Sequence, residues 1–235
     1  MSWSCPKPRW ETVAGRALDS FFLAVRETLP DFEGQLTVFG SAPIQLCLDE
    51  EFISADADVM VLTHADELRG IASRMPQGRT GLIHGVQICP AGWFQTTPHY
   101  LARAHVETRH GLRIVVPHLR DVLIGKLHRS RFEGQDGLVA KDLRAVHQVR
   151  KLCGGHPDEA ELLEDLRLCE PFFRPPTAGE VNHFKLNVLD LWRQFFGRTL
   201  DVQKEIIDQA ASVMFRPSSS GGLQGQLDLL RPERD

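Results

Sequence analysis

Pro117 divides the chain into two parts with different hydrophobic patterns. Before it, short β-rich runs alternate with helical stretches, whereas after it apolar residues recur at helical spacing. This order predicts an α/β (α+β) fold, in which a small mixed sheet is flanked by helices and followed by a helical part. We therefore expect an α/β core over residues 1–117, a mostly helical part over 118–216 and a disordered Ser/Gly-rich tail over 217–235.

The expected elements follow from the period of the apolar residues. Strands are expected at four places: residues 35–39, 57–62, 81–89 and 112–116. Helices are expected at eight places: residues 10–29, 42–50, 65–74, 118–131, 138–152, 158–169, 178–196 and 201–215. The helix over 178–196 carries an apolar stripe that predicts a core-facing side.

Charge limits the classes of function. The net charge is −4, which argues against a protein that coats nucleic acid with a uniformly basic surface. Residues 113–151 nevertheless carry nine Lys or Arg against four Asp or Glu, a pattern that indicates either local phosphate or RNA contact or a solvated helix face. Apolar runs stay below the roughly 18 residues of a membrane span, and residues 1–10 have no apolar signal core, so we expect a cytoplasmic protein without a membrane partner.

A pair of aspartates lies in the segment Ser54-Ala-Asp56-Ala-Asp58. Side chains alternate along a strand, so Asp56 and Asp58 are expected to point the same way. Two neighbouring carboxylates repel each other and lose hydration, and a hard cation such as Mg²⁺ (or Mn²⁺) relieves both costs. This arrangement is typical of phosphoryl and nucleotidyl transfer. The alternatives are hydrated carboxylates at a strand edge, or an aspartate that caps a helix.

Gly40 and Ser41 stand between an expected strand and an expected helix. Backbone N–H groups at such a junction form a site for anions, and the Ser41 hydroxyl can add to it. The alternative is a helix-capping serine after a turn glycine.

Two charged residues fall on the apolar faces of their expected helices. Lys126 lies four residues after Val122, and Asp142 lies four residues after Leu138. Charges at such positions indicate a buried pair or two residues that line a pocket. For the lysine, the alternative is an aliphatic stem that packs on the core while the ammonium group reaches water.

Together, Gly40-Ser41 and Ser54-x-Asp56-x-Asp58 resemble the pattern of the nucleotidyltransferase superfamily, G-S followed by D-x-D. Bacterial abortive-infection type IV toxins, and bacterial proteins described only as nucleotidyltransferase-like, are similar over Arg113-Ile-Val-Val-Pro-His-Leu-Arg-Asp-Val-Leu-Ile-Gly-Lys126-Leu and Lys141-Asp142-Leu. The resemblance covers roughly residues 35–150. It implies four site positions, namely Ser54, Asp56, a triphosphate-contacting Lys126, and Asp142.

The resemblance also implies an activity: transfer of a nucleotide from a nucleoside triphosphate, in some members to tRNA, by a toxin that is paired with an antitoxin protein. The chain departs from polymerase-like members, which place a third carboxylate on a neighbouring strand. The corresponding stretch here offers Gln87 and Cys89. Two hypotheses follow: a metal-dependent nucleotidyltransferase, or a catalytically degenerate member of this fold that serves as a binding or interaction module. A chance match in an unrelated α/β domain is the third alternative.

Overall fold

The computed structural model describes residues 5–52, 56–75, 85–89, 93–134, 137–139, 150, 156–169 and 176–210. The predicted tail over 217–235 lies outside these residues. Within the described ranges, no helix is both long and apolar enough to cross a bilayer.

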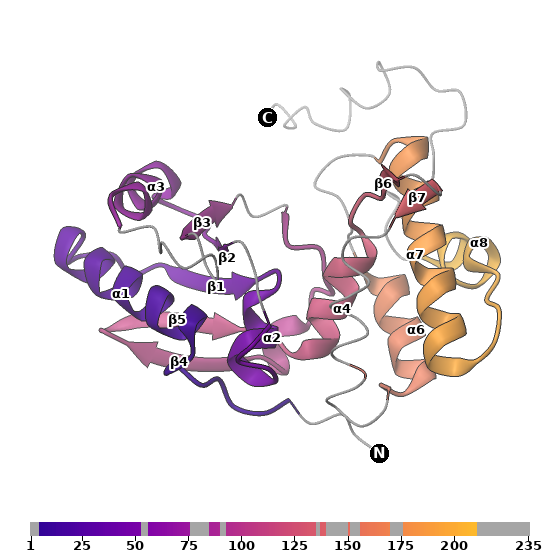
Figure 1. Cartoon of the computed structure of the whole chain (residues 1–235), viewed down its shortest axis with the longest axis horizontal. Helices are drawn as coiled ribbons and strands as arrows, with labels where there is room; N and C mark the ends of the chain where they lie inside the picture. Colours follow the sequence, from indigo (N-terminus) through magenta and orange to yellow (C-terminus); the bar gives the residue numbers. More distant parts are fainter. Residues whose placement is uncertain are drawn as a thin grey trace, which may run out of the picture.

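A five-stranded mixed sheet forms one half of the described structure (Figure 1). Its spatial order is β3-β2-β1-β5-β4. The central strand β1 runs antiparallel to β2 and parallel to β5, β2 and β3 are parallel, and β4 and β5 are antiparallel. The strands span these residues: β1 Gln35–Phe39, β2 Ala57–Met60, β3 Val86–Cys89, β4 His105–Arg109 and β5 Leu112–Val116.

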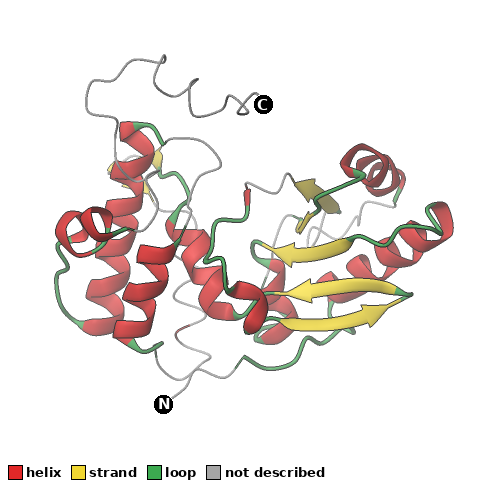
Figure 2. Ribbon diagram, turned by 180° about the vertical axis from the view of Figure 1, so that it is seen from behind, coloured by secondary structure: helices red, strands yellow, loops and turns green. Residues whose placement is uncertain are grey.

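Helices cover the sheet and build the other half of the described structure. Both views place α4 between the sheet and the neighbouring pair α6 and α7 (Figures 1 and 2), and α4 contacts both α2 and α7. The α-helices span these residues: α1 Val13–Thr28, α2 Ala42–Cys47, α3 Ala65–Arg74, α4 Leu119–Leu127, α6 Glu159–Leu168, α7 Ala178–Phe196 and α8 Val202–Glu205. Helix α1 contacts both α2 and α3 beside the sheet.

One hydrophobic cluster joins the two halves. It includes Leu18 and Phe21 of α1, Leu36 of β1, Ile114 of β5 and Trp192 of α7, all fully buried. Burial of continuous apolar surface is the main favourable term in folding, so the sheet and the helices stabilise each other. The stripe expected on 178–196 does face this core.

The mixed α/β architecture is confirmed, and three sequence predictions need correction. The helix expected over 138–152 is wrong at its start, because Gly137–Val139 form strand β7, which pairs antiparallel with β6 (Phe132–Gly134). The sequence reading missed β4, an edge strand whose exposure alternates. The helix expected over 201–215 is only the short α8, followed by a 3₁₀ turn at Ile207–Gln209; residues 211–215 lie outside the described ranges.

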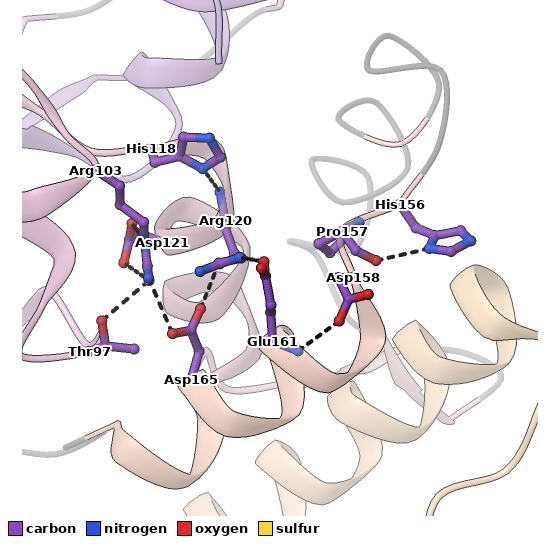
Figure 3. Close-up of polar contacts among 10 residues, drawn as sticks. All are labelled: Thr97, Arg103, His118, Arg120, Asp121, His156, Pro157, Asp158, Glu161 and Asp165. Carbon is purple, nitrogen blue, oxygen red and sulfur yellow. Dashed lines mark hydrogen bonds and ion pairs between the residues drawn. The ribbon is translucent and has the colours of Figure 1, made fainter. Parts of the chain in front are cut away.

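Buried ion pairs fix the orientation of α4 (Figure 3). Asp121, in its first turn, is fully buried and accepts hydrogen bonds from the Arg103 guanidinium at 2.7 Å on each carboxylate oxygen. Arg103 also donates to Asp165 of α6 at 3.2 Å, and Arg120 pairs with Asp165 at 2.6 Å. A buried carboxylate needs such partners to offset its lost hydration. The network therefore ties α4 to α6 and to the segment before β4.

A candidate phosphate and metal site at the end of the central strands

Asp56 and Asp58 meet on one side of the sheet beside Gln87. Asp58 lies in β2, where it pairs with Phe39 of β1 and with Gln87 of β3. The Gln87 amide faces both carboxylates, which requires its nitrogen to point toward them. In that orientation it donates to Asp56 Oδ2 at 2.7 Å and to Asp58 Oδ1 at 3.2 Å. The predicted common direction of the two aspartates is therefore confirmed.

The electrostatic environment disfavours the ionised form of Asp58. Burial raises its pKa to about 6, and the charge of Asp56 acts in the same direction. The positive charges of Arg129 and Lys126 and a hydrogen bond from the Cys89 thiol oppose this shift. The Asp58 carboxylate is thus partly desolvated and lies near the negative charge of Asp56, so a bound cation would stabilise its ionised form.

Gly40 lets the backbone after β1 approach the Asp58 carboxylate. Its φ of +69° lies in the left-handed region, which glycine adopts without steric cost. A Cβ at this position would lie 2.0 Å from Asp58 Oδ2. A residue other than glycine therefore cannot occupy position 40 while the Asp58 side chain keeps its position.

Ser41 makes a contact that differs from helix capping. It stands at the N-cap of α2, but its side chain makes no capping hydrogen bond. Its Oγ instead accepts a hydrogen bond from Lys126 Nζ at 2.8 Å. Lys126 reaches this hydroxyl from α4 with only 8% of its surface exposed. The two predicted residues, 85 positions apart, thus lie in one place, and the lysine does not extend into bulk water.

Arg129 belongs to the same place, although the sequence reading did not select it. It follows α4 one helical turn after Lys126, and its charge lowers the pKa of Asp58. A basic residue near a helix C-terminus is common because it complements the helix dipole. Only its position near Asp58 in the folded chain distinguishes Arg129 from an ordinary surface arginine.

A small pocket, with internal room for about one water molecule, lies beside these residues. Its lining combines aromatic side chains, glycine backbone and two cations: Phe39, Gly40, Trp93, Phe94, Val122, Gly125, Lys126 and Arg129. The pocket and the aspartate pair therefore share Gly40, Lys126 and Arg129 on their common border.

Strand β3, where the resemblance places a third carboxylate in polymerase-like proteins, carries Gln87 and Cys89 in this chain. The Cys89 thiol donates to Asp58 Oδ1 at 3.7 Å, and burial together with Asp58 raises the thiol pKa to about 12, so the sulfur stays protonated. Two further predicted residues, Ser54 and Asp142, lie outside the described residues.

The described residues contain no group of three or more His, Cys, Asp or Glu side chains placed to hold a metal ion. The donors at Asp56 and Asp58 nevertheless fit a hard divalent cation. Mg²⁺ is commonly bound through one or two carboxylates and substrate phosphates, with water completing its shell. Repulsion between the partly desolvated Asp58 carboxylate and its neighbour is also the condition that such a cation relieves. The donor set therefore suits Mg²⁺ or Mn²⁺ bound together with a phosphate ligand.

Comparison with known proteins adds no assignment. No protein-family model matches the chain, and neither a curated protein nor a solved structure matches it.

Proposed function

We propose that this chain is a metal-dependent nucleotidyltransferase, which moves a nucleotide from a nucleoside triphosphate to an acceptor. One observation carries the proposal: the Asp56–Asp58 pair adjoins Gly40, whose neighbour Ser41 is hydrogen-bonded to the buried Lys126. Two carboxylates that could bind a cation and an ammonium group that could bind phosphates thus lie next to each other, where β1 ends and β2 begins. Metal–triphosphate substrates need this combination.

Each group has a role that follows from its chemistry. Asp56 and Asp58 would hold Mg²⁺ or Mn²⁺, which when bound polarises a phosphate and offsets the charge of the leaving group. Lys126, held by Ser41, supplies ammonium donors to the phosphates, and Arg129 offers a planar fork that suits phosphate oxygens. Because the positions of Lys126 and Ser41 are already fixed, little ordering remains to be done on binding.

The transfer step is an in-line displacement. The acceptor hydroxyl oxygen bonds to the α-phosphorus, the bond from that phosphorus to the β-bridging oxygen breaks, and pyrophosphate leaves with the electron pair. The hydroxyl proton passes to water. The acceptor classes are an RNA, a protein hydroxyl or a small molecule, and the basic excess over residues 113–151 favours a phosphate-bearing one. Roles for Ser54 and Asp142, and an antitoxin partner, rest on the sequence alone.

A second candidate is a binding module that keeps the nucleotide site without catalysis. The observation in its favour is Gln87, which stands between the two aspartates where polymerase-like members have a carboxylate. An amide neither accepts a proton as a general base nor adds negative charge to a metal site. The two candidates share nucleotide binding and differ in turnover.

Thermal shift with each of the four nucleoside triphosphates, with and without Mg²⁺, tests the shared site. A ligand that binds only the folded state raises the melting temperature. We expect a Mg²⁺-dependent rise with at least one triphosphate that is lost in Asp56→Asn and Asp58→Asn. The matched control is Asp31→Asn, since Asp31 is exposed in the turn after α1. Absence of any rise at millimolar ligand would contradict both candidates.

Turnover then separates the candidates. Wild type and Asp56→Asn are incubated with the α-labelled form of the triphosphate that binds, together with total RNA or protein. Transfer of label with release of pyrophosphate, absent in the variant, supports the enzyme. Mg²⁺-dependent binding without pyrophosphate release supports the binding module.

A further inference from the structure

Two thiols meet where the segment before α1 passes the end of α2. Cys5 lies in that segment and is half-buried, whereas Cys47 is the last residue of α2 and is only 3% exposed. Their side chains share a hydrogen bond, in which the Cys47 thiol donates to the Cys5 sulfur. Both are free thiols in this structure. The fold has therefore brought together two oxidisable groups from distant parts of the sequence.

The chain around Cys5 holds this contact in place. The Arg9 N–H donates to the Leu46 carbonyl at 2.9 Å, so the segment lies against the end of α2. The Cys5 carbonyl is 3.2 Å from His105 Nε2 on β4, and the Cys5 sulfur accepts a hydrogen bond from the Leu119 backbone N–H at the start of α4. A disulfide needs side chains that are close and well oriented, and three elements of the fold keep Cys5 close to its partner.

The same surroundings make Cys5 a nucleophile. The hydrogen bond from Cys47 lowers the pKa of Cys5 to about 7 although burial opposes this shift, and the Leu119 N–H and the His105 ring also lower it. The thiolate is the form that attacks oxidants, and helix N-termini and nearby histidines favour it. A substantial share of Cys5 is therefore a thiolate near neutral pH.

Cys47 is suited to react second. Its hydrogen bond to Cys5 raises the pKa of the Cys47 thiol, as do burial and the negative charge of Cys5, while the charge of Arg9 opposes them. Two of these causes come from Cys5 itself, so they disappear when Cys5 is oxidised. Oxidation of Cys5 therefore makes Cys47 more reactive toward it.

The other free thiols of the described residues differ from this pair. Burial raises the pKa of Cys89 to about 12, and Cys169 is fully buried. Within the described ranges no three His, Cys, Asp or Glu side chains are placed to hold a metal ion, so Cys5, Cys47 and His105 do not form a zinc site. Thiol chemistry between the two cysteines is what their contact supports.

We propose that Cys5 and Cys47 form a reversible disulfide, with a peroxide as the oxidant, which fastens the segment before α1 to α2. The Cys5 thiolate attacks a peroxide oxygen, the O–O bond breaks, and the leaving hydroxide takes up a proton to give water and a Cys5 sulfenic acid. The Cys47 sulfur then bonds to the Cys5 sulfur, the S–O bond breaks, and the hydroxide leaves as water with the Cys47 proton. The two thiols are oxidised and hydrogen peroxide is reduced to water.

The proposal is independent of the proposed function, since it rests on the contact between the two thiols. Thiol–disulfide exchange with a dithiol reverses the oxidation. Reversible disulfides of this kind act as redox sensors in reducing compartments. The cross-link would enclose residues 5–47, a long loop whose closure restricts the unfolded chain, so oxidation should stabilise the fold.

Peptide mapping tests whether the disulfide forms. The full chain is treated with hydrogen peroxide, its remaining thiols are alkylated, and it is digested with trypsin. Arg9 and Arg26 lie between the two cysteines, so Cys5 and Cys47 enter separate peptides unless a disulfide joins them. We expect a linked pair of peptides that has lost two hydrogen atoms, that separates on treatment with dithiothreitol, and that is absent from Cys5→Ser and Cys47→Ser. The control Cys169→Ala should retain it.

Thermal unfolding of the same samples measures the consequence. Oxidation should raise the Tm of wild type and of Cys169→Ala by about 4–16 °C, the range for one disulfide in a chain of this size, and dithiothreitol should abolish the rise. Cys5→Ser and Cys47→Ser should show no rise. Because position 5 is half-exposed, Cys5→Ser keeps the comparison decisive even if the buried change at Cys47 unfolds the chain.

Three outcomes would overturn the proposal. The first is conversion of Cys5 to the sulfinic or sulfonic acid in folded wild type without any linked pair. The second is a link from Cys5 to a cysteine other than Cys47. The third is formation of the Cys5–Cys47 link at the same rate in urea-unfolded protein, because the folded contact would then contribute nothing.

Discussion

Replacing Gly40 with alanine tests the close approach between the turn after β1 and the Asp58 carboxylate. The new Cβ would lie 2.0 Å from Oδ2 and 3.0 Å from Cγ of Asp58, which is far inside van der Waals contact. The chain also offers a matched control. Gly197, at the C-cap of α7, has φ of +67° against +69° at Gly40, but a Cβ there meets nothing within 4 Å.

The two substitutions therefore share a backbone cost and differ in one contact. Placing a Cβ in the left-handed region costs about 1–2 kcal/mol at either position. At position 40, Asp58 must also rotate or the strand must shift, and contacts of this kind carry coupling energies of about 0.5–3 kcal/mol. Rotation takes the carboxylate away from Gln87, so the proposed metal site would be lost even where the loss of stability is small.

Urea unfolding and nucleotide thermal shift together measure both effects. We expect Gly197→Ala to lose about 1–2 kcal/mol of unfolding free energy and to keep Mg²⁺-dependent nucleotide binding. Gly40→Ala should lose more and should bind no nucleotide. In an Asp58→Ala background the excess cost of Gly40→Ala should disappear. Equal stability of the two alanine variants, with binding intact in Gly40→Ala, would refute the reasoning.

Two further predictions concern buried polar groups, and a third concerns Gln87 beside the aspartate pair. Burial lowers the pKa of His128 to about 3, below the unfolded value of about 6.5, so the unfolded state binds more protons between these values. The contribution of neutral His128 to the free energy of unfolding should be fully present above about pH 6.5 and should fall by about 2 kcal/mol from pH 7 to pH 5. His128→Asn should reduce this dependence on pH in acid titrations followed by circular dichroism. Asp121→Asn removes one of the two carboxylates that pair with Arg103 and should cost about 1.5–3 kcal/mol in urea unfolding; a cost below 1 kcal/mol would contradict the network. Gln87→Glu replaces the amide donor near Asp58 with a third carboxylate, so it should lower the melting temperature without metal and raise the increment that Mg²⁺ adds; equal increments in wild type and variant would exclude a cation there.

The local features of the site could be predicted from the sequence. The strand that ends before Gly40, the alternation that aligns Asp56 with Asp58, and the lysine on an apolar helix face all depend on neighbours within a few residues. The structure places Lys126 in the protein interior, as its position among apolar residues indicated.

The missing features are non-local. Contact of Gln87 with the aspartates depends on the register of β3 against β2, and burial of Asp121 depends on Arg103, 18 positions away. Strand β4 alternates half-buried and exposed residues beside β5, so it lacks the continuous apolar run of a central strand. The helix expected from Leu138 failed at its start because pairing with β6 outweighed the local helical period.

Uptake of Mn²⁺ measured by electron paramagnetic resonance tests the central claim most directly, because the signal of the hydrated ion disappears when the protein binds it. Wild type, Asp56→Asn, Asp58→Asn and the control Asp31→Asn are titrated with and without the triphosphate that gives a thermal shift. The account predicts uptake of about one ion per chain, tighter with the triphosphate, lost in both site variants and retained in the control. Uptake that is equal in wild type and both site variants, or absent at millimolar Mn²⁺ with the triphosphate present, would contradict a metal site on this aspartate pair.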